Sequence, residues 1–332
     1  MPHLLEVEGL TTVFDSDYGC TVSVDHVNFH VDKGEVVCIV GESGCGKSVT
    51  SLSIMGLLGR GGTVTEGSVV FEDKNLLTMT EKELDKIRGD RLTMIFQDPL
   101  TSLDPVFTVG NQLMESIRKH MRLSKEEARK RAEQILGKVG MPDPHGVMKK
   151  YPHTLSGGMR QRVMIAQAMI NSPSLLIADE PTTALDCVVQ AQILELMQEL
   201  RKKLGMSIIM ITHDLGVVAS MCEKIAVMYA GHIVEYGTTD EIFYQPGHEY
   251  TKGLINSIPK LNTEVRERLV PIEGTPVDLL NPPAGCPFAP RCKNCMKICL
   301  SKMPPRTELS DTHYTYCWLQ QKAAFEKGEK AE

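Results

Sequence analysis

Apolar and polar residues follow two kinds of pattern along the chain. Three short runs rich in β-branched and other apolar side chains, at residues 36–40, 175–178 and 207–211, are typical of buried strands. Helical patterns separate these runs. Because strands that alternate with helices usually form a parallel sheet, the pattern predicts an α/β core.

Outside this core the pattern changes twice. Residues 109 to 140 have a helical pattern, and the run from Ser124 to Glu127 is a candidate capping box at the start of one helix. After Tyr244, recurring prolines predict a loop-rich segment. We therefore expect a domain boundary near Gln245, with one domain at residues 1–245 and a second at 246–332.

Composition narrows the class of protein. The chain has 332 residues, 42% of them hydrophobic, which is ordinary for a globular protein with a proper core. Its net charge of −6 gives no support for a nucleic-acid partner. No apolar stretch approaches the roughly 18–20 residues that span a bilayer, and the first residues do not form a signal peptide. We expect a protein that stays in the cytosol.

A glycine-rich loop follows the first strong strand and precedes a helical run. Its pattern is that of a phosphate-binding loop, in which backbone N–H groups bind phosphate oxygens. Lys47 would neutralise the β- and γ-phosphates, and Ser48 would bind Mg²⁺. A chance glycine-rich turn is the alternative, with odds on the order of 1% for a chain of ordinary composition. The loop consists of Gly41, Glu42, Ser43, Gly44, Cys45, Gly46, Lys47 and Ser48.

Two acidic residues end the strand predicted at 175–178. Asp179 would lie on the Mg²⁺ side of a nucleotide, and Glu180 could polarise the attacking water. A solvated loop start is the usual reading of such a pair when it occurs alone. The phosphate loop earlier in the chain favours the catalytic interpretation.

A Ser-Gly-Gly sequence at Ser156, Gly157 and Gly158 precedes a helical run shortly before the acidic strand. Taken alone, Ser156 could be only the N-cap of that helix. In this position the sequence resembles the signature of ABC-type ATPases, although Met159 stands where glutamine is usual. Three further elements of that family occur in the expected order, at Gln97, Asp186 and His213.

The resemblance implies a RecA-like P-loop core with an inserted helical subdomain near residues 99–174. It also implies that Gln97 contacts the metal and water, and that His213 reaches the γ-phosphate. The signature residues and the segment with Asp186 would complete the ATP site of an opposing subunit in a head-to-tail pair. Adenine would stack on an early aromatic side chain, Phe14 or, in reserve, Tyr18, although core packing is an open alternative for both.

The C-terminal segment narrows the family. Residues 247–254, 272–276 and 285–292 resemble the C-terminal region of dipeptide and oligopeptide importer ATPases. This resemblance implies peptide uptake with a related second ATPase, two membrane subunits and an extracytoplasmic binding protein, and places the chain at the cytoplasmic face of the membrane. Other cargo (oligosaccharides, nickel complexes or haem) is an alternative, as is a soluble ABC-type ATPase. A degenerate regulatory subunit is disfavoured, since Glu180 and His213 are present.

Five of the ten cysteines crowd near the end of the chain. In a reducing compartment the crowding indicates a metal centre rather than disulfides. By chemistry alone, four thiolates suit an iron–sulfur cluster or zinc, Cys292 and Cys295 could form a zinc knuckle, and unmetallated cysteines are a third possibility. The family resemblance omits Cys295 and implies a [4Fe–4S] cluster on Cys286, Cys292, Cys299 and Cys317.

Overall fold

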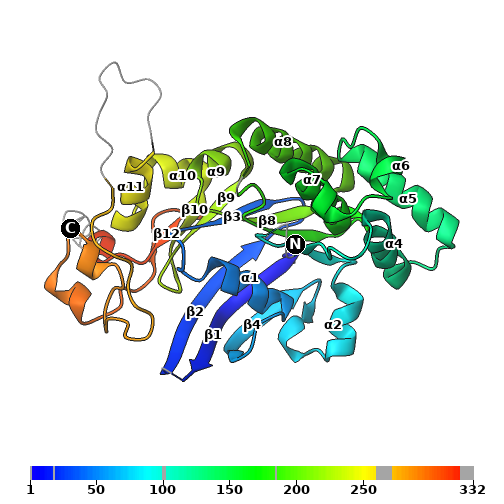
Figure 1. Ribbon diagram of the computed structural model, residues 1–332. Helices are drawn as coiled ribbons and strands as arrows, with labels where there is room; N and C mark the ends of the chain where they lie inside the picture. Colours follow the sequence, from blue (N-terminus) through cyan, green and yellow to red (C-terminus); the bar gives the residue numbers. More distant parts are fainter. Residues whose placement is uncertain (1, 18, 99–101, 184, 259–270, 322–332) are drawn as a thin grey trace, which may run out of the picture. The chain divides into compact units, whose positions relative to one another are not determined.

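A computed structural model describes residues 2–17, 19–98, 102–183, 185–258 and 271–321 (Figure 1). The chain forms two compact units. The first comprises residues 1–5, 31–36 and 70–211, and the second comprises residues 6–30, 37–69 and 212–332. The domain boundary expected near Gln245 stays a prediction.

Parallel strands form the centre of the first unit. β6 (Leu92–Ile95), β7 (Leu175–Asp179) and β8 (Ser207–Thr212) pair in this order, with Leu92 opposite Leu175 and Leu175 opposite Ser207. Every residue of β7 and β8 is buried. Continuous burial explains why these strands are mainly apolar, and the strands predicted at 175–178 and 207–211 are confirmed.

Helices make up much of the rest of this unit. α4 (Val109–His120), α5 (Lys125–Lys138) and α7 (Gly157–Met169) pack against one another (Figure 1). The capping box predicted at the start of α5 is confirmed, because Ser124 and Glu127 bond each other's backbone N–H groups. The other helices and the short strand of this unit are β5 (Lys74–Asn75), α2 (Glu81–Ile87), α6 (Pro144–Val147) and α8 (Cys187–Leu204), with 3₁₀ turns at Leu76–Thr78 and Pro152–Thr154.

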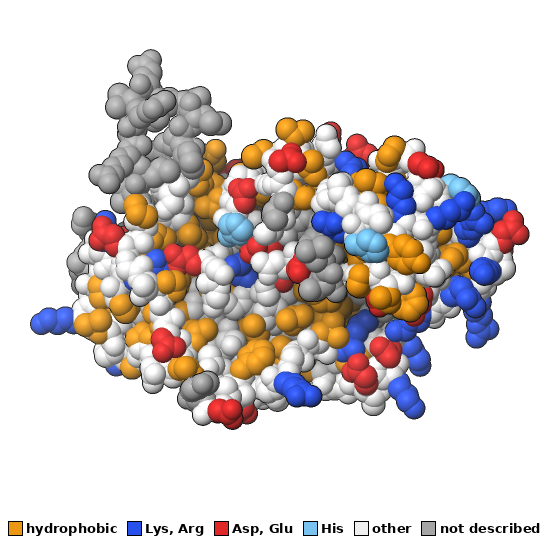
Figure 2. Space-filling view, in the orientation of Figure 1, with side chains coloured by type: hydrophobic (Ala, Val, Ile, Leu, Met, Phe, Trp, Pro, Cys, Tyr) orange, Lys and Arg blue, Asp and Glu red, His pale blue; other side chains and the backbone are white. Residues whose placement is uncertain are grey.

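The two faces of α5 differ in polarity. Ala128, Ala132 and Leu136 are fully buried against the neighbouring helices, whereas the basic residues other than Arg131 are exposed. Arg131 is half-buried and donates to the carbonyl of Ile170. Figure 2 shows Lys and Arg side chains gathered over this part of the surface.

The second unit combines parallel and antiparallel pairing. β3 (Val36–Val40) pairs in parallel with β9 (Lys224–Tyr229), which pairs antiparallel with β10 (His232–Thr238). The short strands β12 (Tyr314–Thr315) and β11 (Thr307–Glu308) extend the edge beyond β10. The remaining elements are β1 (Leu5–Ser16), β2 (Gly19–Val31), β4 (Gly62–Phe71), α1 (Lys47–Met55), α9 (Leu215–Met221), α10 (Thr239–Tyr244) and α11 (Glu249–Asn256), with 3₁₀ turns at Ala289–Arg291 and Lys297–Leu300.

Candidate functional site

The predicted phosphate loop connects β3 to α1 in the second unit. Lys47 is the first residue of α1, and only 5% of it is exposed. Its Nζ donates to the carbonyl oxygens of Gly41 at 2.8 Å and Glu42 at 2.9 Å. The ammonium group therefore lies within the loop, where it can exchange carbonyl partners for phosphate oxygens. Ser48 follows in the first turn of α1, at the helix end that favours anions.

Glycine is required at two positions of this loop. Gly44 and Gly46 have φ of 78° and 105°, in the region that side chains rarely adopt. A Cβ at Gly46 would also collide with the carbonyl oxygen of Ser23. The other loop residues differ in exposure: Ser43 is exposed, whereas Cys45 is buried with its Sγ 3.9 Å from the Nζ of Lys47. Burial raises the pKa of the Cys45 thiol.

The two predicted acidic residues lie at the end of β7 in the first unit. Asp179 is the last strand residue and is 4% exposed. Glu180 follows with a φ of 45°, a left-handed conformation that is uncommon for a residue with a side chain. Its N–H donates to the carbonyl of Ile211 at 2.9 Å, so the backbone turns sharply as it leaves the sheet.

Two side chains hold the carboxylate of Glu180. Gln97, which follows β6, donates through Nε2 to Oε2 of Glu180 at 3.2 Å, and Thr183 donates through Oγ1 to the same oxygen at 2.8 Å. The structure thus brings Gln97 and Glu180 together, although 82 residues separate them in the sequence. We did not predict from the sequence that Thr183 binds the Glu180 carboxylate. Its position three residues after Glu180 was the only feature of the sequence that pointed to this contact.

The signature residues lie at the start of α7. Ser156 is the N-cap, and its hydroxyl accepts from the N–H of Met159 at 3.3 Å, so the capping interpretation is confirmed. Ser156 and Gly157 are exposed. Gln161 is buried and donates to the carbonyl of Pro181, which connects this helix to the loop that follows Glu180. The sequence had no signal for this connection.

The remaining predicted nucleotide residues are distributed over both units. His213 is exposed directly after β8, before the cap of α9, and belongs to the second unit. Asp186 caps α8 in the first unit by accepting from the N–H groups of Val188 and Val189. Phe14 is half-buried in β1, next to Gly62. Tyr18 lies outside the described residues.

Four cysteines line one small cavity in the second unit. They are Cys286, Cys292, Cys299 and Cys317, whereas Cys295 is exposed and lies outside the lining. The N–H of Cys286 donates to the carbonyl of Cys299 at 2.8 Å. The structure therefore gathers the four cysteines that the family resemblance singled out.

Four cysteine thiols in one cavity are a ligand set that suits either an iron–sulfur cluster or a structural zinc ion. Burial, followed by the nearby thiols, raises the pKa of Cys286 to about 12, and burial raises that of Cys292 to about 11. Ionising these thiols therefore needs a strong cationic partner.

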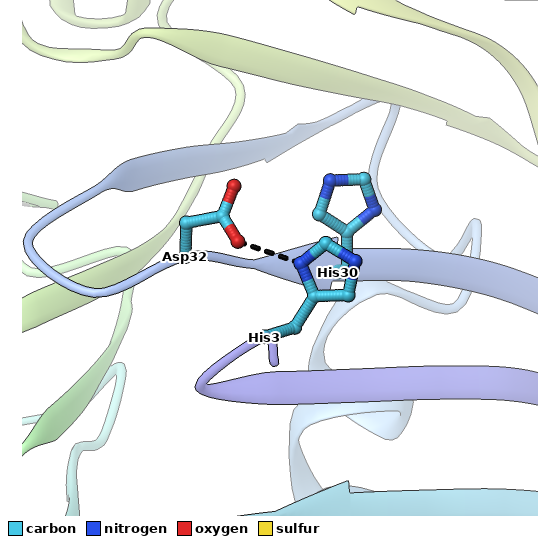
Figure 3. Close-up of side chains that lie close together, drawn as sticks. All are labelled: His3, His30 and Asp32. Atoms are coloured by element: carbon cyan, nitrogen blue, oxygen red, sulfur yellow. Dashed lines mark hydrogen bonds and ion pairs between the residues drawn. The ribbon is translucent and has the colours of Figure 1, made fainter. Parts of the chain in front are cut away.

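Two half-buried histidines near the start of the chain each have a charged partner. His3 Nδ1 lies 2.6 Å from Asp32 Oδ1 (Figure 3). His30 is also drawn in Figure 3, and its Nε2 lies 3.2 Å from Nζ of Lys224. A lysine ammonium so close to His30 disfavours a metal cation there, so we assign no metal to these histidines.

Comparison with known proteins decides the family. Residues 24–183 match a family model described as ABC transporter, and residues 234–299 match one described as oligopeptide/dipeptide transporter, C-terminal region. The dipeptide transport ATP-binding protein DppD of Bacillus subtilis is 52% identical over 98% of this chain and 97% of its own length. The chain belongs to the ATP-binding subunits of dipeptide and oligopeptide ABC transporters. It is therefore an ABC-type ATPase that binds ATP.

Other relatives of this family support the assignment. The oligopeptide transport ATP-binding protein OppD of Salmonella typhimurium is 49% identical over 95% of this chain and 93% of its own. Among solved structures, a post-hydrolysis dimer of the ATP-binding cassette MJ0796 with ADP and phosphate matches with a TM-score of 0.64, at 30% identity over 71% of this chain and 98% of that one. The structure of cbiO1 from Clostridium perfringens matches with a TM-score of 0.62, at 30% identity over 74% and 92%. The predicted ABC ATPase fold is confirmed.

Because the family consists of transporter subunits, the presence or absence of membrane-spanning helices is relevant. In the described part of the chain, no helix is both long and apolar enough to cross a bilayer.

Proposed function

We propose that this chain hydrolyses ATP to drive the import of dipeptides or oligopeptides. The names of its relatives and the match of residues 234–299 to a peptide-transporter region support this cargo. Oligosaccharides, nickel complexes and haem are the alternative cargoes. Uptake of labelled dipeptides by vesicles containing the assembled transporter tests the proposal, and uptake of one of the alternatives without peptide uptake would contradict it.

We propose different residues to bind the phosphates, the Mg²⁺ ion and the adenine ring of the nucleotide. Lys47 neutralises the β- and γ-phosphates, and the backbone from Gly41 to Gly46 donates to phosphate oxygens. Ser48 and Gln97 are proposed ligands of Mg²⁺, with Asp179 on the metal side. Phe14 is the proposed contact of the adenine ring.

Glu180 is the proposed residue that polarises the attacking water. This role is supported by the position of Glu180 at the end of a buried strand. Gln97 and Thr183 both donate to one oxygen of its carboxylate. A carboxylate held in this way can accept a proton from water. His213 is proposed to contact the γ-phosphate, whose charge grows during hydrolysis.

A second ATPase subunit is proposed to complete the site. Ser156, Gly157 and Gly158 lie at a helix N-terminus, which favours anions, and would donate to the γ-phosphate held by the opposing subunit. Asp186 belongs to the segment expected at the same junction. We propose a related but different second ATPase, two membrane subunits and an extracytoplasmic binding protein, with this chain peripheral at the cytoplasmic face of the membrane.

The catalytic assignment is tested by Glu180→Gln in the reconstituted transporter, with the partner's own site disabled. We expect ATP binding to persist and turnover to fall by about a thousandfold, because the base is lost while the phosphate contacts remain. The control is Glu199→Gln, which removes an exposed carboxylate of α8 that pairs with Lys203. Turnover of Glu180→Gln close to that of the control would contradict the assignment.

We also propose a [4Fe–4S] cluster on Cys286, Cys292, Cys299 and Cys317, with zinc as the alternative. The shared cavity, whose lining does not include Cys295, supports it. Anaerobically purified protein should be brown and contain about four iron atoms per chain. Serine at any of the four positions should remove the colour, whereas Cys295→Ser should not. Colourless anaerobic protein with one zinc would overturn the cluster.

A further inference from the structure

Glu42, the second residue of the phosphate loop, forms a two-point ion pair with a residue far along the chain. Its Oε2 lies 2.5 Å from one terminal nitrogen of Arg291, and its Oε1 lies 2.9 Å from the other. The side chain of Arg291 is 4% exposed and that of Glu42 is 26% exposed. Two parallel charge-assisted hydrogen bonds fix the direction of the carboxylate as well as its charge.

Arg291 itself is held from several sides. Its Nε donates to the carbonyl of Glu273 at 3.0 Å, and a terminal nitrogen donates to the hydroxyl of Tyr229 at 3.3 Å. The guanidinium group also lies over the Tyr229 ring, 5.8 Å from its centroid. The hydrogen bonds that Arg291 donates to Glu42 are the main cause that raises the pKa of Arg291. This arginine is therefore a rigid part of the C-terminal segment and not a mobile surface side chain.

The backbone of Glu42 has a second partner from the same half of the chain. Its N–H donates to the hydroxyl oxygen of Tyr250 at 2.8 Å, and Tyr250 is fully buried. The Tyr250 ring packs 4.6 Å from that of Tyr229 and 5.4 Å from that of Phe288. Phe288 and Arg291 lie in the stretch between Cys286 and Cys292, so the cysteine-lined cavity and the contacts to Glu42 share one short piece of chain.

Glu42 connects these contacts to the lysine of the loop. Its carbonyl oxygen is one of the two that bind the Nζ of Lys47. The N–H, the carbonyl and the carboxylate of Glu42 are thus all engaged, two of them by the C-terminal half of the chain. A shift of this one residue would move a partner of Lys47 and would also change the charge beside the phosphates.

We infer that the cysteine-rich C-terminal segment positions the phosphate loop and neutralises its acidic residue, through Arg291 and Tyr250 acting on Glu42. The inference rests on the proposed role of this loop in holding the phosphates. Arg291 and Tyr250 are positioning residues, since they act through Glu42. The loop therefore needs the C-terminal segment to bind ATP with full affinity, although the nucleotide motifs all precede residue 240.

The test measures binding of ATP, ADP and AMP to the full chain by calorimetry. Arg291→Gln leaves the Glu42 carboxylate unpaired beside the phosphates, so we expect ATP to bind about tenfold more weakly. The loss should decrease from ATP to ADP to AMP, because fewer phosphate charges meet the carboxylate. Adding Glu42→Gln to Arg291→Gln should restore part of the affinity, since it removes the repelling charge.

The matched control is Lys293→Gln, two residues further along. Lys293 is 66% exposed and pairs only at the surface, 3.2 Å from Glu273, so its loss should change affinity less than twofold. Arg291→Lys keeps the positive charge but cannot form both hydrogen bonds to the Glu42 carboxylate. Tyr250→Phe keeps the ring but removes the hydroxyl oxygen that accepts from the Glu42 N–H. Each should weaken ATP binding by a few-fold, and these two variants decide the question if Arg291→Gln does not fold.

Three outcomes have separate meanings. Equal ATP affinity in wild type, Arg291→Lys and Tyr250→Phe overturns the inference and leaves the proposed function intact. A loss in Arg291→Gln that is equal for ATP and AMP, and that Glu42→Gln does not relieve, also overturns it, because it indicates general loosening of the fold. Absence of ATP binding in the wild-type chain contradicts the proposed function itself.

Discussion

At the residue scale, the backbone and the hydrogen bonds of Glu180 agree with its proposed catalytic role. Its left-handed backbone costs on the order of 1–2 kcal/mol for a residue with a side chain. The surrounding hydrogen bonds, from Gln97, Thr183 and the backbone to Ile211, offset this cost. The hydrogen bonds from Gln97 and Thr183 keep the carboxylate in a defined position.

Thr183 should matter for turnover because its hydroxyl holds one oxygen of Glu180. We expect Thr183→Val to lower the ATPase rate on the order of tenfold at unchanged ATP affinity, since it removes a positioning contact and no phosphate contact. Thr183→Ser keeps the hydroxyl and should retain most of the activity. Steady-state rates and binding isotherms of the two variants provide the comparison. Equal rates in both would mean that the hydroxyl has no such role.

Cys45 should react slowly with alkylating reagents. Burial raises the pKa of its thiol above the ordinary value of 9.0, so the reactive thiolate is scarce at neutral pH and increases as the pH rises. We expect slower labelling by iodoacetamide than at the exposed Cys187, and a further decrease with Mg²⁺–ATP because the bound phosphates cover the loop. Mass spectrometry at several pH values measures both rates. Labelling of Cys45 as fast as that of Cys187 would contradict this expectation.

At the scale of elements, several of the proposed nucleotide-binding residues lie at helix starts. α1 begins with Lys47, α7 is capped by Ser156, and α8 is capped by Asp186. The free N–H groups of a helix start are anion sites, which is why motifs that bind phosphate coincide with caps. A cap can therefore have a structural and a functional role at the same residue.

Glu241 in the capping box of α10 should make stability depend on pH. Burial alone would raise its pKa, but hydrogen bonds from Ser310, Thr238 and Thr312 outweigh burial and lower the pKa from 4.5 to about 2. Its contribution to stability is therefore present above about pH 4.5 and is lost as the pH falls toward about 2. Glu241→Gln should flatten the decrease of unfolding free energy over this range in urea titrations. The exposed neighbour Asp240→Asn is the control, and an equal slope in both variants would contradict the assignment.

At the scale of the whole molecule, the proposed ATP site needs a second subunit, which makes one substitution diagnostic. Ser156→Asp keeps an N-cap of similar strength, so the helix stays intact, but it introduces a negative charge where the partner's γ-phosphate would lie. We expect ATP-dependent association with the second ATPase to weaken, while ATP binding by this chain alone stays unchanged.

Ser156→Asn is the matched control for that experiment, because it caps the helix without adding charge. Association can be followed by size-exclusion chromatography, with Glu180→Gln present in both chains to prevent hydrolysis. Equal association of the Asp and Asn variants would contradict the head-to-tail arrangement.

Several features were predictable because they are local in the sequence. The strands at 175–178 and 207–211 and the capping box at Ser124 depend on neighbouring residues with a fixed spacing, which short patterns record. The four cysteines of the cavity could be selected only through the family resemblance. Spacing alone left Cys295 as an equal candidate, since the distance along the chain says little about how a proline-rich segment turns.

The sequence by itself determined the α/β class, the ATP-binding motifs and the family, because these follow from apolar periodicity and from contiguous motifs. Only the tertiary structure decided which side chains form hydrogen bonds and ion pairs with the proposed site residues. The contact between Glu42 and Arg291 spans 249 positions of the chain, and that between Gln97 and Glu180 spans 83. Such pairs form when burial of apolar surface brings distant segments together, and one sequence has no periodicity or spacing that records which charged or polar residues then meet.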